Sequence, residues 1–319
     1  MNGIKKKLGE EPIELIFHNI HNHGTEIVDM WINELETRTG GKVKFTKSSG
    51  ENPGLIAAAD VVRDVPVMSN QYPLLNLIQV PFVFPSATVG SRVIAQLYSE
   101  FSELRDELND VKIVGLGTGA LMAIFSSRDW GPIRTLKDFK GARTRSLIPI
   151  DGVIAALGAK PMHVGYLEIS HLLRTGQLDA AVLGVLPAYT FRLAEGAAPY
   201  CTLAGDLSIT MHPIRIYMKW DTWNKLPRDI QIVIDETGPA NSDCWYAIHS
   251  GTDADNSLLE AIDYIKQKGE LVRLTPEELK RWRQVTHIPR DSVVRDVEAR
   301  GLPGRRFFNR MNELVAEYQ

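Results

Sequence analysis

The stretch that decides the fold runs from Leu136 to Gly184 and reads LKDFKGARTRSLIPIDGVIAALGAKPMHVGYLEISHLLRTGQLDAAVLG. It alternates three short strand candidates with two helix candidates, and glycines stand at the joints between them. The strands are expected at Ala142–Arg145, Lys160–Val164 and Leu178–Leu183, and the helices at Ile150–Leu157 and Tyr166–Leu173. Such a βαβαβ unit builds a parallel sheet, and ligands of these sheets bind beyond the carboxyl ends of the strands.

Two arginines stand at the end of the first of these strands, Arg143 and Arg145. Residues two apart on a strand project to the same face, so the two guanidinium groups could share one target. Guanidinium forks suit carboxylates, which they hold by paired charge-assisted hydrogen bonds. The alternative is that one or both arginines pair with acidic side chains of the protein surface. The two residues alone leave both interpretations open.

The surrounding motifs resemble those of a known family. Within the stretch they are Asp138–Gly141, Arg143–Arg145, Ala156–Pro161, Glu168, Leu172–Gly176 and Leu178–Ala180. Elsewhere they are Thr39–Val43, Val80–Pro85, Pro132–Thr135, Trp223–Pro227 and Leu274–Leu279. In order and spacing they resemble the solute-binding proteins of tripartite ATP-independent periplasmic (TRAP) transporters, the dicarboxylate-receptor-like family. The resemblance extends along nearly the whole chain.

The resemblance implies an α/β fold of the two-lobed periplasmic-binding-protein type, with discontinuous domains and a long helix that spans both lobes. Lobe I would comprise residues 12–124 plus 212–250, and lobe II residues 125–211 plus 251–285. Residues 286–319 would form helices that pack on the lobes. The long helix would follow Pro227, with an interruption near Gly238, and end at about Lys268.

The resemblance also places a ligand arginine on Arg145, in lobe II. Two positions depart from the family pattern: Met122 stands where a second arginine is common, and Leu183 where an asparagine is common. A second ligand charge would then be buried without a partner, which costs several kcal/mol. The ligand is therefore expected to have one carboxylate and an apolar or aromatic body.

Four further residues are candidates for the cleft between the lobes: His18, His21, His212 and Tyr217. His18 or His21 could donate a hydrogen bond to an anion from a polar loop. Together with His23 they could alternatively hold a transition metal, although such a site needs fixed geometry and usually a fourth ligand. His212 and Tyr217 are as well explained by structural roles. We expect no metal and no cofactor.

Composition limits the class of protein. The chain has 319 residues, 44% of them hydrophobic, and a net charge of −3. This length suits about two domains. The slightly negative charge argues against a nucleic-acid-binding protein, since such proteins are usually basic. No run approaches the ~20 apolar residues of a membrane helix. Met1–Glu11 is charged rather than signal-like, so an export signal is not expected within it. The two cysteines, Cys201 and Cys244, do not make a disulfide scaffold, although one bridge between them stays open.

Three other patterns bear on the fold and on a possible cofactor. In Gly115–Ala120 the third glycine comes one position early for a dinucleotide motif, which argues against a nicotinamide site. The connection Ser48–Ala59 is short for a parallel crossover, so either it is truly short or residues are absent from the sequence. Val89–Leu108 predicts one long amphipathic helix.

No catalytic constellation emerges, and we expect a binding protein rather than an enzyme. The resemblance implies that the chain is the periplasmic solute-binding protein of a TRAP-type secondary transporter. It would capture a small carboxylate with Arg145 and deliver it to the small and large membrane subunits, without itself entering the membrane or binding nucleic acid. The alternatives are an enzyme acting on a small carboxylate with the same scaffold, or a sensory receptor without a transporter.

Overall fold

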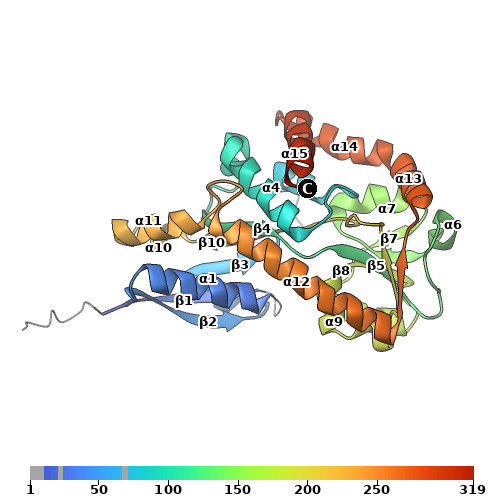
Figure 1. Cartoon of the computed structure of the whole chain (residues 1–319), viewed down its shortest axis with the longest axis horizontal. Helices are drawn as coiled ribbons and strands as arrows, with labels where there is room; N and C mark the ends of the chain where they lie inside the picture. Colours follow the sequence, from blue (N-terminus) through green and yellow to red (C-terminus); the bar gives the residue numbers. More distant parts are fainter. Residues whose placement is uncertain (1–10, 21–23, 67–70) are drawn as a thin grey trace, which may run out of the picture.

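The computed structural model describes residues 11–20, 24–66 and 71–319, and it has two β-sheets, one in each lobe (Figure 1). The sheet of lobe I has the order β2-β1-β3-β10-β4. Its strands are β1 (Ile13–Asn19), β2 (Val43–Ser49), β3 (Val61–Asp64), β4 (Lys112–Thr118) and β10 (Pro213–Met218). β1 pairs in parallel with β2 and β3, whereas β10 runs antiparallel to β3 and β4. The chain therefore returns from lobe II to the middle of this sheet.

The sheet of lobe II contains the predicted βαβαβ unit. Its order is β11-β9-β5-β8-β6-β7. Its strands are β5 (Met122–Ser126), β6 (Arg143–Arg145), β7 (Lys160–Met162), β8 (Ala180–Gly184), β9 (Tyr200–Leu203) and β11 (Glu270–Arg273). β6 pairs in parallel with both β7 and β8, through the connecting helices α7 (Asp151–Ala156) and α8 (Ile169–Arg174). The prediction from the deciding stretch is confirmed.

Helices cover both faces of each sheet because their apolar stripes must be buried. In lobe I, α1 (Thr25–Arg38) and α11 (Arg228–Thr237) share one apolar cluster with the sheet. In lobe II, α7 and α13 (Pro276–Val285) cover one face, with the Trp282 ring stacked on Phe139. The other face of lobe II belongs to the largest cluster, which continues into lobe I.

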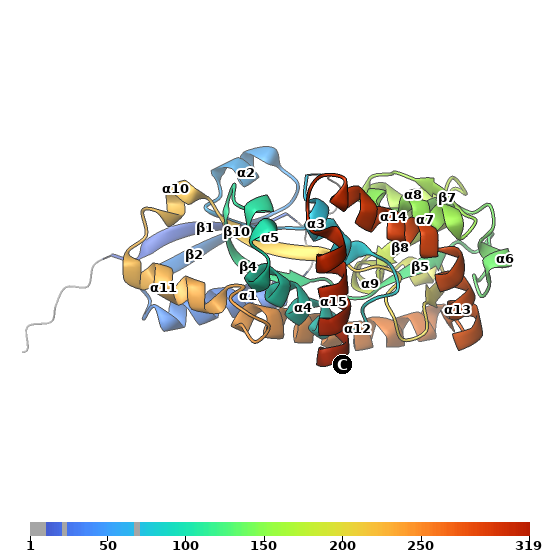
Figure 2. The ribbon, with the colours of Figure 1, turned by 90° about the horizontal axis from the view of Figure 1, so that it is seen from above.

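Within the part of the chain that the structure describes, three segments cross between the lobes: the turn from β4 to β5, the segment from β9 to β10, and the helix α12 (Trp245–Lys268). α12 runs along both sheets (Figures 1 and 2), as the long helix was expected to do. It lies close to α4 (Ala87–Glu100), since a methyl group at Gly251 would lie 2.5 Å from Thr88 Cα. The predicted lobe boundaries stay predictions.

The C-terminal helices α14 (His287–Glu298) and α15 (Gly304–Tyr318) follow α13. The Phe307 ring of α15 packs edge-on against Phe101, and Arg310 forks onto Glu100 at the end of α4. Among the described residues, other short helices are α3 (Pro73–Asn76), α6 (Leu136–Phe139), α9 (Val185–Thr190) and α10 (Trp220–Trp223), and 3₁₀ turns lie at Leu77–Gln79, Ile148–Ile150, Tyr166–Glu168 and Leu193–Glu195.

The local structure bears on two segments singled out in the sequence. The helix predicted over Val89–Leu108 is wrong as one element: it breaks at Phe101, whose backbone is extended, into α4 and α5 (Ser102–Glu107). The connection between β2 and β3 carries a six-residue helix, α2 (Pro53–Ala58), capped by the Asn52 side chain.

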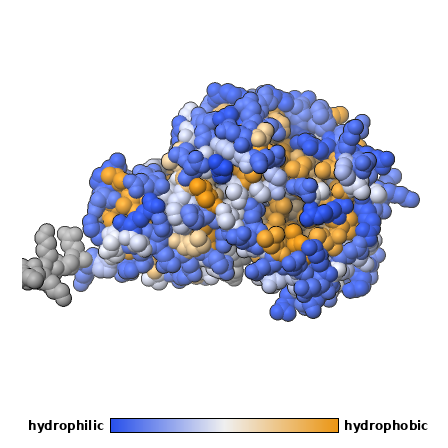
Figure 3. Space-filling model, in the orientation of Figure 1, coloured by the Kyte–Doolittle hydropathy of each residue, from blue (hydrophilic) through white to orange (hydrophobic). Residues whose placement is uncertain are grey.

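The surface in Figure 3 is hydrophilic over most of this face, and apolar side chains gather mainly over lobe II. Each helix in the described part of the chain is too short or too polar to cross a bilayer.

Candidate functional site

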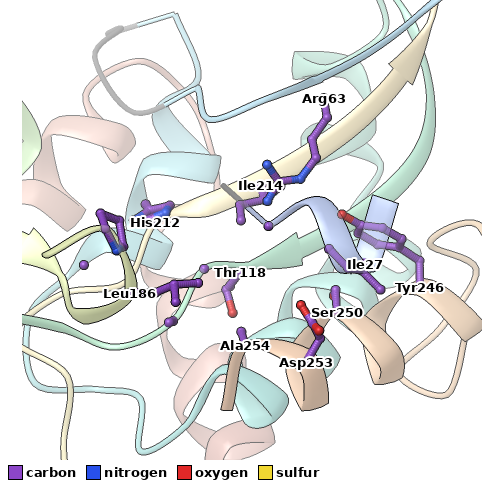
Figure 4. Close-up of a pocket in the computed structure, with 15 residues that line it drawn as sticks. Ile27, Arg63, Thr118, Leu186, His212, Ile214, Tyr246, Ser250, Asp253 and Ala254 are labelled. Atoms are coloured by element: carbon purple, nitrogen blue, oxygen red, sulfur yellow. The ribbon is translucent and has the colours of Figure 1, made fainter. Parts of the chain in front are cut away.

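A pocket lies between the lobes, where the β4–β5 turn and the segment before β10 lie near α12 (Figure 4). Its volume is about 40 Å³, which gives room for several water-sized groups. Residues of both lobes and of all three crossings line it: Gly24, Ile27, Arg63, Thr118, Gly119, Ala120, Gly184, Leu186, Pro187, His212, Ile214, Tyr246, Ser250, Asp253 and Ala254. A concave, largely apolar pocket with a few polar groups is typical of a small-molecule site.

Arg63 brings a positive charge to this pocket from lobe I. Its side chain is only 3% exposed, and its Nη1 donates to Asn19 Oδ1 over 3.1 Å. The guanidinium lies against Gly24, where a methyl group would be 2.8 Å from Nη2. Burial raises the pKa of Tyr246, and a hydrogen bond with Arg63 opposes that rise. Sequence reasoning missed Arg63, although an arginine inside the apolar strand β3 is itself a signal.

His212 and Met122 were both predicted, and the structure brings them together. His212 lines the pocket, and its Nδ1 lies 3.3 Å from Met122 Sδ. Since a thioether is a weak acceptor, this contact favours a proton on Nδ1. Met122 is 3% exposed, and its backbone N–H donates to Ser208 Oγ. The imidazole is thus positioned from two crossing segments at once.

Arg145 lies at the carboxyl end of β6 and is 7% exposed. Its Nη1 donates to Val182 O over 2.9 Å, while its buried Nε has no hydrogen-bond partner among the described residues. Burial lowers the pKa of this guanidinium, and Tyr166 acts in the opposite direction. Arg145 is not among the residues that line the pocket of Figure 4. It is nevertheless a buried cation with hydrogen-bonding capacity left over.

Arg143 does not share a target with Arg145. Its Nε and Nη2 fork onto Asp179 over 2.9 and 2.7 Å, and Nη2 also donates to Gly176 O. Burial raises the pKa of Asp179, but the Arg143 hydrogen bonds outweigh it and lower that pKa overall. The geometry therefore gives Arg143 the structural role that the sequence left open.

The other predicted residues that the structure describes do not line this pocket. His18 is fully buried, and its two ring nitrogens contact Ser48 Oγ and Gly50 O within lobe I, each at 2.8 Å. Leu183 packs in the largest apolar cluster, although the adjacent Gly184 lines the pocket. The ring of Tyr217 lies 4.9 Å from the Arg215 guanidinium. His21 falls outside the described residues, as does His23.

Metal ligation and disulfide bonding can be assessed only among the described residues. Among these, no group of histidine, cysteine, aspartate or glutamate side chains is arranged to hold a metal ion. Cys201 and Cys244 are both free and buried, so they do not form a bridge.

Residues 60–291 match the family model described as "Bacterial extracellular solute-binding protein, family 7", or DctP. The chain belongs to this family. A solute-binding protein of Sulfitobacter sp. (strain NAS-14.1) is 32% identical over 178 residues. That alignment covers 54% of this chain and only 51% of the Sulfitobacter protein, about half its length.

Several solved structures share the DctP-family fold. A TRAP solute-binding protein from a marine metagenome, specific for aromatic acids and bound to 3-hydroxybenzoate, superposes with a TM-score of 0.86 at 20% identity. It covers 97% of this chain and 100% of its own. A TRAP solute-binding protein from Rhodoferax ferrireducens T118 in complex with benzoate has a TM-score of 0.85 at 17% identity. The match covers 96% of this chain and 98% of the Rhodoferax chain. A TRAP solute-binding protein from Bordetella bronchiseptica with bound (R)- and (S)-mandelate has a TM-score of 0.83 at 19% identity. The match covers 97% of this chain and 100% of the Bordetella chain. These similarities confirm the two-lobed fold.

Proposed function

We propose that this DctP-family chain is the exported solute-binding protein of a TRAP-type transporter, acting in the periplasm. It captures a small organic acid with an apolar or aromatic body and delivers it to the membrane subunits. The interlobe pocket, lined by both lobes and by all three crossings, carries this proposal. A ligand that contacts both lobes stabilises their closed arrangement, so binding shifts the population toward it.

Arg145 is our choice for the group that binds the carboxylate. Its head group is buried, yet Nε lacks a partner among the described residues, so an added carboxylate would complete its hydrogen bonds. Met122 and Leu183, at the positions where the family pattern has an arginine and an asparagine, are uncharged. One carboxylate with an apolar body fits this balance better than a dicarboxylate, whose second charge would need its own partner. Benzoate, hydroxybenzoate and mandelate in the related structures have this character.

The test is a ligand screen by thermal shift, followed by calorimetry. We expect benzoate, 3-hydroxybenzoate or mandelate to raise the melting temperature, and succinate to leave it unchanged. A ligand at 100 times its dissociation constant adds about 2.7 kcal/mol to stability. Arg145→Gln should weaken binding by at least about 30-fold, since truncating one partner of a buried charge pair costs upwards of 2 kcal/mol. Arg174→Gln, at an exposed position of α8, is the matched control.

Three outcomes contradict parts of this proposal. If succinate alone stabilises the protein, the conclusion drawn from Met122 and Leu183 is wrong. If Arg145→Gln binds as tightly as the unchanged protein, the carboxylate is held elsewhere, with Arg63 the next candidate. If the acid is recovered chemically altered after long incubation, the chain is an enzyme rather than a binding protein.

A further inference from the structure

Asp253 lies on the third turn of α12, and its side chain reaches the interlobe pocket. Figure 4 shows its carboxylate directed toward the cavity beside Ser250. The residue is partly buried, so the carboxylate is only partly hydrated. Sequence reasoning did not single it out, because one aspartate on a polar helix face is ordinary.

This carboxylate has no hydrogen bond or ion pair with any residue that the structure describes. Burial raises the pKa of Asp253 above its usual value; the Glu26 carboxylate raises it further, and Arg63 opposes both. Asp255, two residues along the same helix, is the contrast. Its two oxygens accept from Ala87 N, Thr88 N and Thr88 Oγ1 over 2.6–2.9 Å. An acceptor without such partners gains most from a donor on the ligand.

The charges around the cavity define what such a ligand can present. Arg63 and Asp253 both line it, with opposite charges and no ion pair between them. A ligand carboxylate beside Asp253 would meet a like charge, whereas a hydroxyl can donate to it at no electrostatic cost. The remaining walls are largely apolar, with Ile27, Leu186 and Ile214 among them. These walls suit an aromatic or aliphatic body whose carboxylate points away from Asp253.

We infer, on the basis of the proposed function, that the ligand is a hydroxylated organic acid whose hydroxyl donates to the carboxylate of Asp253. Asp253 thus determines specificity within the class of acids that the pocket accepts. It distinguishes an acid with a donor group on its body from one without.

The experiment compares acids that differ by one hydroxyl. Calorimetry measures the dissociation constants of benzoate and the three hydroxybenzoate isomers, and of phenylacetate and mandelate. We expect at least one hydroxylated acid to bind about 10- to 100-fold more tightly than its parent, the range typical of a hydrogen bond to a charged group. In Asp253→Ala this ratio should fall to about one, and in Asp253→Asn, which keeps an acceptor oxygen, to an intermediate value. Asp263→Ala, at an exposed position of the same helix, should keep the full ratio.

The outcomes separate this inference from the proposed function. If benzoate binds but no hydroxylated acid binds more tightly than its parent, the inference is overturned and the proposed function stands. If the preference exists but survives in a folded Asp253→Ala variant, the acceptor is another group, and the inference is again overturned. If no acid binds at all, the proposed function fails, and the inference fails with it.

Discussion

Arg215 and Asp64 form a nearly buried ion pair between β10 and β3. Nε and Nη2 of Arg215 fork onto the two carboxylate oxygens over 2.8 and 3.0 Å, and Nη1 donates to Tyr72 Oη. Burial lowers the pKa of Arg215, but Asp64 outweighs it and raises that pKa overall. Asp64→Ala leaves the guanidinium buried without its counter-charge, so we expect a loss of about 3–5 kcal/mol in urea unfolding.

The control for this pair is Lys42–Asp229, in which both side chains are largely exposed. Asp229→Ala should leave the unfolding midpoint almost unchanged, because solvent screens such pairs. If both substitutions lowered the free energy of unfolding equally, burial would not be the reason why the Arg215–Asp64 pair stabilises the fold.

The arginines show how far single residues can be interpreted from sequence. The family motif picks out Arg145, which lies buried at the carboxyl end of β6, and its role in ligand binding stays a proposal. The partner of Arg143 is Asp179, 36 residues away, so no local pattern reveals it. Arg63 reaches the pocket only because β3 and α12 meet in the fold. An arginine inside an apolar strand such as β3 predicts a polar or charged partner in the interior, but the sequence does not identify that partner.

At the scale of elements, Glu107 of α5 receives the first N–H groups of α3. Its oxygens accept from Leu74 N and Leu75 N over 2.6 and 3.2 Å. Burial raises the pKa of Glu107 to about 7 from 4.5, against these two hydrogen bonds. The folded state therefore binds more protons than the unfolded state between these values. The contribution of Glu107 to the free energy of unfolding is fully present below about pH 4.5. It decreases as the pH rises and is lost above about pH 7.

We expect Glu107→Gln to remove this slope. The free energy of unfolding of the unchanged protein, relative to the variant, should fall by about 1–3 kcal/mol between pH 5 and pH 7.5. Urea unfolding at several pH values measures it. Parallel curves for the two proteins would mean that Glu107 is ionised throughout this range in the folded state.

The same elements explain which boundaries the sequence predicts. β1 and α1 follow the periodic apolar positions of the sequence, since each buries one local stripe. The break at Phe101 has no such local signal, because the ring packs on Phe307 of a helix about two hundred residues later. Likewise the N-terminus of α4 is held by Asp255 of α12. Contacts of this range appear only when the chain is folded.

For the whole molecule, two of the three crossings touch at the pocket. Gly119 N donates to His212 O over 3.1 Å, which joins the β4–β5 turn to the segment before β10. A methyl group at Gly119 would lie against Nε2 of the His212 ring and 2.9 Å from its Cε1. The ring has little freedom to yield, because its Nδ1 already contacts Met122. Gly119 therefore lies in a segment that connects the lobes and also lines the pocket.

Gly119→Ala should therefore impair closure more than folding. We expect weaker binding of whichever acid the screen identifies, and a smaller ligand-induced decrease in the radius of gyration measured by X-ray scattering. Gly196→Ala is the control, because that glycine has open space around it and no left-handed backbone. Lobe folding is checked by far-ultraviolet circular dichroism, which should match for both variants. A Gly119→Ala protein that binds and closes like the unchanged chain would show that this contact does not couple the pocket to the lobe movement.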